Sequence, residues 1–412
     1  MRTLYTWLLR ALLPGILLRL WWRGRREPGY REGLAERFGL YAGERKEKML
    51  WVHAVSVGEA RAAAPLVRAL HDALADHGIV LTCTTAAGRE TLKQVYGESV
   101  QAAYLPYDYP AAVQGFLQHF RPRLGVLMET EVWPNLVAGC AANAVPLVLA
   151  NARMSEKSAR GYRRLRSLSR PAFESLAAVC AQSEADAQRL RALGAREVQI
   201  TGNLKFDVEP SAAQLEAGMA WRAALGRPVL LLASTREGEE RLLLDALPVW
   251  DGRLLVVVVP RHPQRFDEVA QWADARRSRS ELPGARHRVY LGDTMGEMAF
   301  YYGACDVAVI GGSFMPLGGQ NLIEALAAGA PVVVGPSMFN FAEATRLALE
   351  AGAALQVADA PAAIREALRL LGSPDKRSAI RLAGRQLCAA HRGATQRHLA
   401  VCRRLLGSKI GL

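Results

Sequence analysis

Short apolar segments that suit buried parallel strands alternate with helical segments along most of this chain, and this alternation constrains the fold more than any other feature. The first series predicts strands at 49–57, 79–84, 124–128, 146–150, 177–182 and 197–201, with helices at 59–76, 110–119, 133–143 and 184–193. The series restarts after Pro228, with strands at 229–233, 254–259, 287–291, 306–310 and 331–334 and helices at 237–247, 264–273, 296–302 and 321–328. The sequence therefore predicts an α/β chain of two doubly wound, Rossmann-like domains.

The length of 412 residues also favours two domains over one core. The polar segment VEPSAAQLEAG lies between the two series and is the predicted connection. We expect an N-terminal segment at 1–31, a first domain at 32–208, a linker at 209–226, a second domain at 227–385 and a C-terminal helix at 386–412 that can cross back to the first domain. A cleft between the domains is the expected active site.

The N-terminal segment is apolar from Thr3 to Trp22, rich in arginine and free of lysine. Arg10, Pro14 and Arg19 interrupt the apolar run, which favours a helix lying in the membrane interface; a membrane span and a helix packed on the protein itself are the alternatives. The cluster RGRR at 23–26 indicates that the following chain stays on the cytoplasmic side. The formal net charge of +13 fits an anionic membrane surface, a phosphorylated substrate or nucleic acid.

Neither cysteines nor paired aspartates indicate a metal. The six cysteines are scattered, with no pair at zinc-binding spacing, and the chain has no Asp-x-Asp motif of the kind that holds a divalent cation on a diphosphate. A metal-free mechanism is therefore expected.

One strand–turn–helix segment is typical of a nucleotide site. The predicted strand at 306–310 ends in Gly311 and Gly312, and a second pair, Gly318 and Gly319, precedes a helix that opens at Asn321. Backbone N–H groups at such a helix start can face an anion, and Glu324 can reach a ribose. The alternative is that the glycines serve only packing.

Carboxylates and a lysine follow several strands of the first domain. Glu59 begins a helix after the first strand, where the helix dipole favours the ionised carboxylate that a general base needs. Glu129 and Glu131 follow the strand at 124–128, and Lys205 follows the last strand. Each of these residues also has a structural alternative. Glu59 can simply stabilise its helix, Glu129 and Glu131 can cap a helix or pair with Arg153, and Lys205 can be an ordinary solvated surface lysine.

In the second domain, Arg261 and His262 end one strand and suit a phosphate or a pyrimidine edge. Gly296 to Met298 open another helix and can offer backbone groups to a base. Each cluster alone also fits ordinary packing, but they recur at the same edge of the predicted sheet.

Taken together, eight motifs in order closely resemble the bacterial 3-deoxy-D-manno-octulosonic acid (Kdo) transferases, glycosyltransferase family 30. They are SVGE at 56–59, METEVWPN at 128–135, NARMS at 151–155, GNLKFD at 202–207, STREGEE at 234–240, PRHPQRF at 260–266, GDTMGE at 292–297 and GGSFMPLGGQNLIEA at 311–325. The resemblance implies a GT-B enzyme, inverting and metal-independent, without a cofactor, that moves Kdo from the donor CMP-Kdo to a lipid A precursor (lipid IVA) in lipopolysaccharide synthesis. It implies a location at the cytoplasmic face of the inner membrane through the N-terminal helix, and no nucleic-acid partner.

Residue roles follow from the same resemblance. Glu59 would be the general base, and Lys205 together with Glu131 would support the transition state. The implied CMP-binding residues are Arg261, His262, Gly296, Glu297, Met298, Asn321, Leu322, Ile323 and Glu324. The chain has Thr85-Ala-Ala-Gly88 where family members often have Thr-Pro-Thr-Gly, a difference expected to alter a loop only.

Two other functions are also compatible with the residue patterns. One is a GT-B glycosyltransferase or sugar-nucleotide epimerase that uses a UDP-sugar. The other is a non-catalytic basic protein that binds anionic lipid or nucleic acid, which would explain the charge but not the polar clusters at the strand ends.

Overall fold

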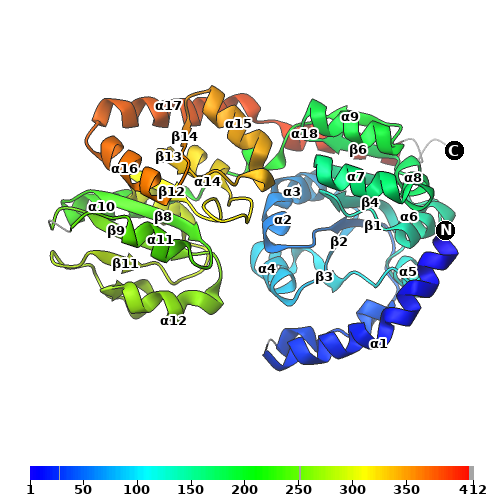
Figure 1. Cartoon of the computed structure of the whole chain (residues 1–412). Coiled ribbons are helices and arrows are strands. Elements are labelled where there is room, and N and C mark those ends of the chain that lie inside the picture. The colour runs from blue at the N-terminus through cyan, green and yellow to red at the C-terminus, as the bar shows by residue number, and fades with distance from the viewer. Residues whose placement is uncertain (27, 250–251, 408–412) are drawn as a thin grey trace. The chain divides into compact units, whose positions relative to one another are not determined.

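The computed structural model describes residues 1–26, 28–249 and 252–407 (Figure 1). The chain forms two compact units, one made of Met1–Asp207 with the chain from Gly393 onward, the other of Val208–Arg392. Each contains one parallel sheet of seven strands. The predicted pair of doubly wound sheets is thereby confirmed.

The sheet of the first unit has the strand order β3-β2-β1-β4-β5-β6-β7, so the chain reverses its winding between β1 and β4. Its strands are β1 (Met49–His53), β2 (Gly78–Cys83), β3 (Gln101–Tyr104), β4 (Pro122–Met128), β5 (Leu147–Ala152), β6 (Ala178–Ala181) and β7 (Val198–Ile200). In open parallel sheets, the carboxyl edge at such a switch point is where ligands bind.

Helices cover both faces of this sheet. They are α2 (Val57–Ala62), α3 (Ala64–Ala73), α4 (Ala86–Tyr96), α5 (Pro110–Phe120), α6 (Pro134–Ala142), α7 (Glu156–Arg164), α8 (Arg166–Glu174), α9 (Glu184–Leu193) and α18 (Ala394–Gly407). Successive residues of β1 point to opposite faces: Trp51 packs with Phe116 of α5 in one core, and Val52 packs with Leu66 of α3 and Leu399 of α18 in the other. This two-sided burial explains why the strands read as continuous apolar runs.

The sheet of the second unit has the order β10-β11-β9-β8-β12-β13-β14, with its switch point between β8 and β12. The strands are β8 (Val229–Thr235), β9 (Leu255–Pro260), β10 (Ala275–Arg276), β11 (Val289–Leu291), β12 (Val307–Ile310), β13 (Val332–Val334) and β14 (Ala354–Gln356). The helices are α10 (Ala212–Leu225), α11 (Glu239–Asp245), α12 (Phe266–Val269), α13 (Met298–Ala304), α14 (Leu322–Ala328), α15 (Ala342–Glu350), α16 (Ala360–Leu371) and α17 (Pro374–His391).

Several element boundaries differ from those predicted. The strands β3, β10 and β14 were not expected, because each is only two to four residues long and carries little β-branched signal. The predicted helix at 264–273 is instead the four residues of α12 between two 3₁₀ turns. Short edge elements of this kind are stabilised by their neighbours rather than by their own periodicity.

The predicted C-terminal helix is two helices, because the chain turns at Gly393 with a φ of +90°. Helix α17 lies in the second unit and α18 in the first. The carboxylate of Asp207 accepts hydrogen bonds from the N–H groups of Gly393 (2.8 Å) and Thr395 (2.5 Å), which fixes the start of α18. The last five residues of the predicted segment, 408–412, lie outside the described residues.

The N-terminal helix α1 (Arg2–Arg26) packs on the first unit through few side chains. Only 6% of its most apolar window is buried, and that window, with a mean hydropathy of 1.2, is long and apolar enough to cross a membrane by length and composition. Thr6 is nevertheless buried against Asn135, and the hydroxyl of Tyr109 donates to the carbonyl of Leu9 at 2.8 Å. Residue 27 of the predicted N-terminal segment lies outside the described residues.

Candidate active site

Glu59 lies at the switch point of the first sheet, in the first turn of α2 directly after β1. Ser56 caps this helix by accepting from the N–H of Glu59 (3.3 Å), and the Glu59 carboxylate accepts from the N–H of Val55 (2.9 Å) and the hydroxyl of Ser56 (3.1 Å). This reciprocal arrangement is similar to a capping box, with the N–H of Val55, one residue before the N-cap, as the backbone donor. Glu59 therefore has a structural role as a cap, and the box also fixes its position at the sheet edge.

The pKa of Glu59 is raised to about 7. Burial is the largest cause, the charge of Glu129 adds to it, and the hydrogen bond from Val55 opposes it. The helix start was expected to favour the ionised form of Glu59, but burial outweighs that effect and raises the pKa. A carboxylate with this pKa accepts a proton far more readily near neutral pH than an ordinary glutamate does.

Glu129 follows β4 in a left-handed conformation with a φ of +58° and is 6% exposed. Its two carboxylate oxygens accept from Lys205 Nζ at 2.9 Å and from Arg153 Nε at 2.8 Å. Burial opposes ionisation, but these two cations outweigh it and hold the pKa of Glu129 below its ordinary value. Strained backbone of this kind persists where the surroundings impose it, often at functional sites.

Of the two METE carboxylates, Glu129 pairs with Lys205, and the joint role expected of Glu131 and Lys205 in the transition state stays a prediction. Glu131 instead accepts from the indole N–H of Trp133 at 2.7 Å. Burial, opposed by this bond and helped by the charge of Glu129, raises the pKa of Glu131. Two residues of METE thus have distinct environments, an ionised Glu129 and a Glu131 that holds its proton more tightly.

The loop that carries Lys205 is held by the side-chain amides of Asn151 and Asn203. Lys205 donates its backbone N–H to Asn203 Oδ1 at 3.0 Å, and Leu204 donates to Asn151 Oδ1 at 3.0 Å. Asn151 has a φ of +51°, and its own N–H donates to His398 Nε2 of α18 at 2.9 Å. The motifs NARMS and GNLKFD therefore meet in the structure and position the ammonium group.

The helix after METE is also fixed at its start. The Asp108 carboxylate accepts from the N–H groups of Asn135 (3.0 Å) and Leu136 (2.7 Å), and the Asn135 amide donates to Thr6 of α1 at 3.0 Å. The loop that bears Glu129 and Glu131 thus lies between β4 and a helix capped from a neighbouring loop.

The switch point of the second sheet is organised by Glu239, a fully buried residue. Its carboxylate accepts from the N–H groups of Gly312 (2.5 Å), Phe314 (2.9 Å) and Arg236 (2.8 Å). Glu239, which follows β8, therefore holds the glycine turn that follows the neighbouring strand β12.

The expectation that Gly318 and Gly319 present bare N–H groups to an anion is wrong. Gly318 donates to Ser337 Oγ at 3.1 Å, and Gly319 donates to the carbonyl of Gly312 at 2.7 Å. Their φ values are +86° and +75°, and a Cβ atom at either position would clash with Met338 or the Phe339–Asn340 side chains. These glycines therefore make the tight turn that brings the chain to α14.

At the start of α14, Asn321 is the N-cap, and its side chain accepts from the N–H of Ile323 at 3.2 Å. Leu322 and Ile323 are buried, while Glu324 is partly exposed. Of the four residues predicted here, Asn321 and Glu324 have side chains that can reach a ligand, and Leu322 and Ile323 can contribute backbone only.

Three arginines surround His262 at the ends of β8 and β9. Burial lowers the pKa of His262, and the charges of Arg236, Arg261 and Arg265 lower it further. Arg265 also pairs with buried Glu240 at 2.5 Å, which fixes it in place. This cationic cluster is suited to a phosphate group.

Gly296 has a φ of +83° and open space where a Cβ atom would be, and Glu297 pairs with Arg277 at 2.8 Å. The hydrogen bond from Arg277 lowers the pKa of Glu297, with burial opposing it. Met298 is the first residue of α13. The Glu297 carboxylate therefore holds the loop, and the backbone next to Gly296 is accessible.

The pairing with Arg153 that the sequence offered as an alternative is confirmed for Glu129, whereas sequence reasoning missed the roles of Glu239 and Glu240. Glu239 and Glu240 lie in the STREGEE motif, and two acidic residues in the first turn of a helix are an ordinary sequence signal of helix stabilisation. Their burial and long-range partners are invisible in the sequence. Among the residues that the structure describes, no three or more His, Cys, Asp or Glu side chains gather to hold a metal ion, and the metal-free mechanism stays a prediction.

Solved structures with the same fold include an Anabaena protein, HepE, in complex with UDP and glucose. It is 15% identical, covers 89% of this chain and 100% of its own, and has a TM-score of 0.58. A UDP-GlcNAc 2-epimerase from Neisseria meningitidis is 16% identical, covers 86% of this chain and 99% of its own, and has a TM-score of 0.59. These likenesses show the GT-B fold.

Sequence comparisons give the family. The family described as 3-deoxy-D-manno-octulosonic-acid transferase (kdotransferase) matches residues 32–208. The 3-deoxy-D-manno-octulosonic acid transferase of Bordetella pertussis is 48% identical over 98% of this chain and 100% of its own length, and that of Haemophilus influenzae is 36% identical over 97% of each. The chain therefore belongs to the 3-deoxy-D-manno-octulosonic acid transferase family of glycosyltransferases.

Proposed function

We propose that the enzyme transfers Kdo from CMP-Kdo to a hydroxyl of a lipid A precursor, lipid IVA, with inversion and with Glu59 as the general base. The observation that carries the proposal is the position of Glu59 at the switch point with a pKa raised to about 7. The paired charges of Glu129 and Lys205 next to it support the same assignment.

In the proposed step, Glu59 takes the proton of the acceptor hydroxyl while that oxygen forms a bond to the anomeric carbon of Kdo. The bond from this carbon to the phosphate oxygen of CMP breaks, and CMP leaves with the electron pair. One displacement of this kind inverts the anomeric centre. Lys205 and Arg153 supply positive charge at the same sheet edge, where it can interact with the carboxylate of Kdo or the leaving phosphate.

The proposed CMP site is in the second unit. His262 with its neighbouring arginines would bind the phosphate, the open backbone at Gly296 would meet the base, and Glu324 would bind the ribose. Asn321 and Glu239 would hold the shape of the loop. The expected interdomain cleft, the domain limits and these residue roles remain predictions.

We further propose that α1 attaches the enzyme to the cytoplasmic face of the inner membrane. Its exposed residues include Trp7, Leu12, Leu18, Trp21 and Trp22, and Trp residues favour membrane interfaces. The enzyme would then encounter its lipid acceptor at the membrane surface.

The test uses the purified full chain with CMP-Kdo and lipid IVA in detergent micelles. We expect a glycolipid heavier by one or more Kdo residues in the mass spectrum, release of CMP, and no loss of rate in EDTA. A thermal-shift experiment should show stabilisation by CMP but not by UDP. Absence of the glycolipid, or transfer from a UDP-sugar instead, would overturn the proposal. Family membership already decides against the non-catalytic alternative.

A further inference from the structure

The joint between α7 and α8 carries an unbalanced positive charge. Its basic residues are Lys157, Arg160, Arg163, Arg164, Arg166 and Arg170, and no acidic residue lies between Glu156 and Glu174. We call these six residues, together with Leu165, the basic corner. All seven are exposed. A block of this composition attracts anions, although most charged helices are simply solvated.

The basic corner neutralises few of its charges internally. Arg163 pairs with Glu156 at 2.8 Å, and Arg170 pairs with Glu174 at 2.7 Å. For Arg160, Arg164 and Arg166, no ion pair or hydrogen bond is formed within residues 1–26, 28–249 and 252–407. Three guanidinium groups, each with five donors, are thus available to an external partner.

Leu165 stands at the joint between these arginines and is 56% exposed. It is held there rather than loosely placed. Its N–H donates to the carbonyl of Tyr162 at 3.1 Å, Ser169 Oγ donates to the same carbonyl at 2.8 Å, and the Tyr162 ring packs edge-on against Phe173 at 5.2 Å. An apolar side chain fixed outward and flanked by arginines on both sides suits a surface with a charged rim and an apolar interior.

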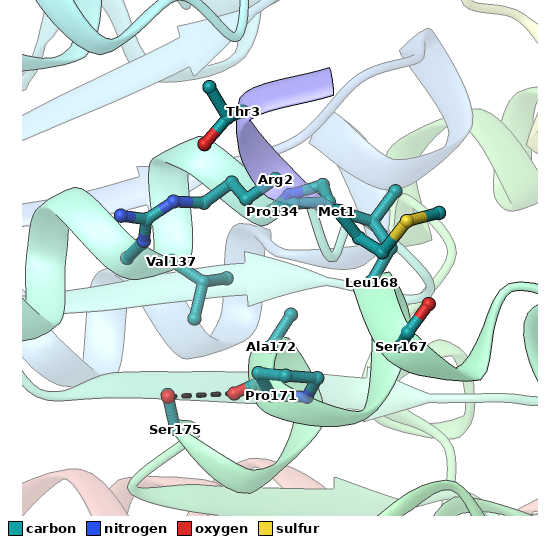
Figure 2. A pocket seen from close by; sticks show the side chains of 11 residues that line it. Met1, Arg2, Thr3, Pro134, Val137, Ser167, Leu168, Pro171, Ala172 and Ser175 are labelled. Carbon is teal, nitrogen blue, oxygen red and sulfur yellow. Dashed lines mark hydrogen bonds between the residues drawn. The ribbon is translucent and has the colours of Figure 1, made fainter. Parts of the chain in front are cut away.

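A groove of about 370 Å³ lies between the start of α1 and helix α8. Its lining includes Met1, Arg2 and Thr3 as well as Ser167, Leu168 and Pro171 of α8, which are sequence neighbours of Arg166 and Arg170 (Figure 2). The exposed apolar residues Trp7, Leu8 and Leu12 continue along α1 from this point. The start of α1 and the part of α8 next to Arg166 and Arg170 therefore border the same groove of the first unit.

We propose that the basic corner is a second membrane-binding element, which binds anionic phospholipid headgroups through its arginines and inserts Leu165 into the interface. The proposal rests on the proposed attachment of α1 to the membrane. A helix with an apolar surface binds neutral and anionic lipid alike, whereas arginines add selectivity for anionic lipid. Because each basic residue near such a surface strengthens binding by a factor of about five, three arginines account for about 100-fold.

The test measures co-sedimentation of the full chain, without donor or acceptor, with vesicles of phosphatidylcholine alone or mixed with phosphatidylglycerol. The variant R160Q/R164Q/R166Q should lose about 100-fold in affinity for the anionic vesicles and keep its affinity for the neutral ones. The matched control R286Q/R365Q/K376Q removes the same charge from exposed positions of the second unit and should bind like the unchanged chain. The variant L165S should weaken binding to both vesicles.

Thermal unfolding of the variants should change little, because the substituted side chains are exposed. Equal loss in the control variant, or anionic binding retained in R160Q/R164Q/R166Q, would overturn the proposal. So would a higher KM for lipid IVA in detergent with unchanged vesicle binding, which would assign the arginines to the acceptor phosphates. Vesicle binding is measured without turnover, so it can be interpreted even if the proposed transfer reaction is not observed.

Discussion

At the switch point of the first sheet, between β1 and β4, ionisable side chains from separate segments meet: Glu59, Glu129, Arg153 and Lys205. At the switch point of the second sheet, between β8 and β12, one buried carboxylate, Glu239, holds a turn of backbone N–H groups from inside. The first edge therefore presents side chains whose charges influence one another, and the second presents a shaped loop with arginines beside it.

Under the proposed function, this difference lets one topology serve two chemical tasks. Proton transfer needs a group whose pKa is adjusted, and burial next to Glu129 does this for Glu59. Holding a nucleotide, as proposed for the second unit, needs a fixed backbone, and the hydrogen bonds of Glu239 to Gly312, Phe314 and Arg236 would supply that rigidity. Substitutions at the first edge should consequently lower turnover, and substitutions at the second edge should weaken CMP binding.

The largest effect is expected from Glu59→Gln. Turnover should fall by about 10²–10⁴-fold, because an amide cannot take the acceptor's proton, while the affinity for CMP stays the same. In the unchanged enzyme, kcat/KM should rise with pH through an apparent pKa near 7, since Glu59 must be ionised. Rate measurements with CMP-Kdo and lipid IVA, together with calorimetry of CMP binding, check this. Wild-type turnover would remove Glu59 as the base.

Glu59→Gln should lower turnover but raise the stability of the folded chain. The raised pKa means that the folded chain holds the proton of Glu59 more tightly than the unfolded chain, so its contribution to stability is lost as pH rises through about 7. Glu59→Gln removes this loss and keeps the cap. At pH 8 the free energy of unfolding of this variant should be about 1–2 kcal/mol higher than that of the unchanged chain, and at pH 4 the difference should vanish.

Glu129→Gln should cost about 3 kcal/mol of the free energy of unfolding, because Lys205 and Arg153 lose their shared counter-charge in a buried setting. Urea unfolding measures this, and Glu131→Gln, which removes no ion pair, is the matched control with an expected cost below about 1 kcal/mol. Because Glu129 raises the pKa of Glu59, the acid limb of the rate profile should also move to lower pH. An unmoved profile would mean that the two carboxylates are not coupled.

Glu239→Gln should weaken CMP binding by about tenfold and lower stability by about 2 kcal/mol, since one of the N–H groups of Gly312, Phe314 and Arg236 then faces an amide donor. Turnover at saturating donor should change little, in contrast with Glu59→Gln. The exposed neighbour in Glu237→Gln is the control for charge. A loss of turnover without a loss of CMP affinity would contradict the division of tasks between the two edges.

The last effect concerns stability alone and depends on His398, whose Nδ1 donates to the carbonyl of Ala394 (2.7 Å) while Nε2 accepts from Asn151. Burial lowers its pKa to about 4, so its contribution to stability is present above pH 6.5 and is lost as pH falls toward 4. The free energy of unfolding should fall by about 1 kcal/mol per pH unit from this residue. Urea unfolding of His398→Gln should show a shallower acid slope; buried His53, with a similar pKa, supplies the remainder.

Much of the fold was predictable because its strands are buried on both faces and therefore apolar throughout, as at Leu255–Pro260. The edge strands β3 and β14 were not predictable, since pairing with the neighbouring strands β2 and β13 rather than their own composition stabilises them. For the candidate site, the positions of Glu59 and Lys205 after strands were visible in the sequence. The ion pair of Lys205 with Glu129 was not visible, because it depends on the left-handed backbone of Glu129 and on segments far apart in the chain.

By itself, the sequence determined the alternation of strands and helices, the motifs at the strand ends and the family to which the chain belongs. These depend on local composition and order, which a linear pattern carries. Only the tertiary structure decided which carboxylate is ionised, which glycines turn the chain and which N–H groups Glu239 holds. Burial and through-space charge set these properties, and both depend on residues far apart in the chain.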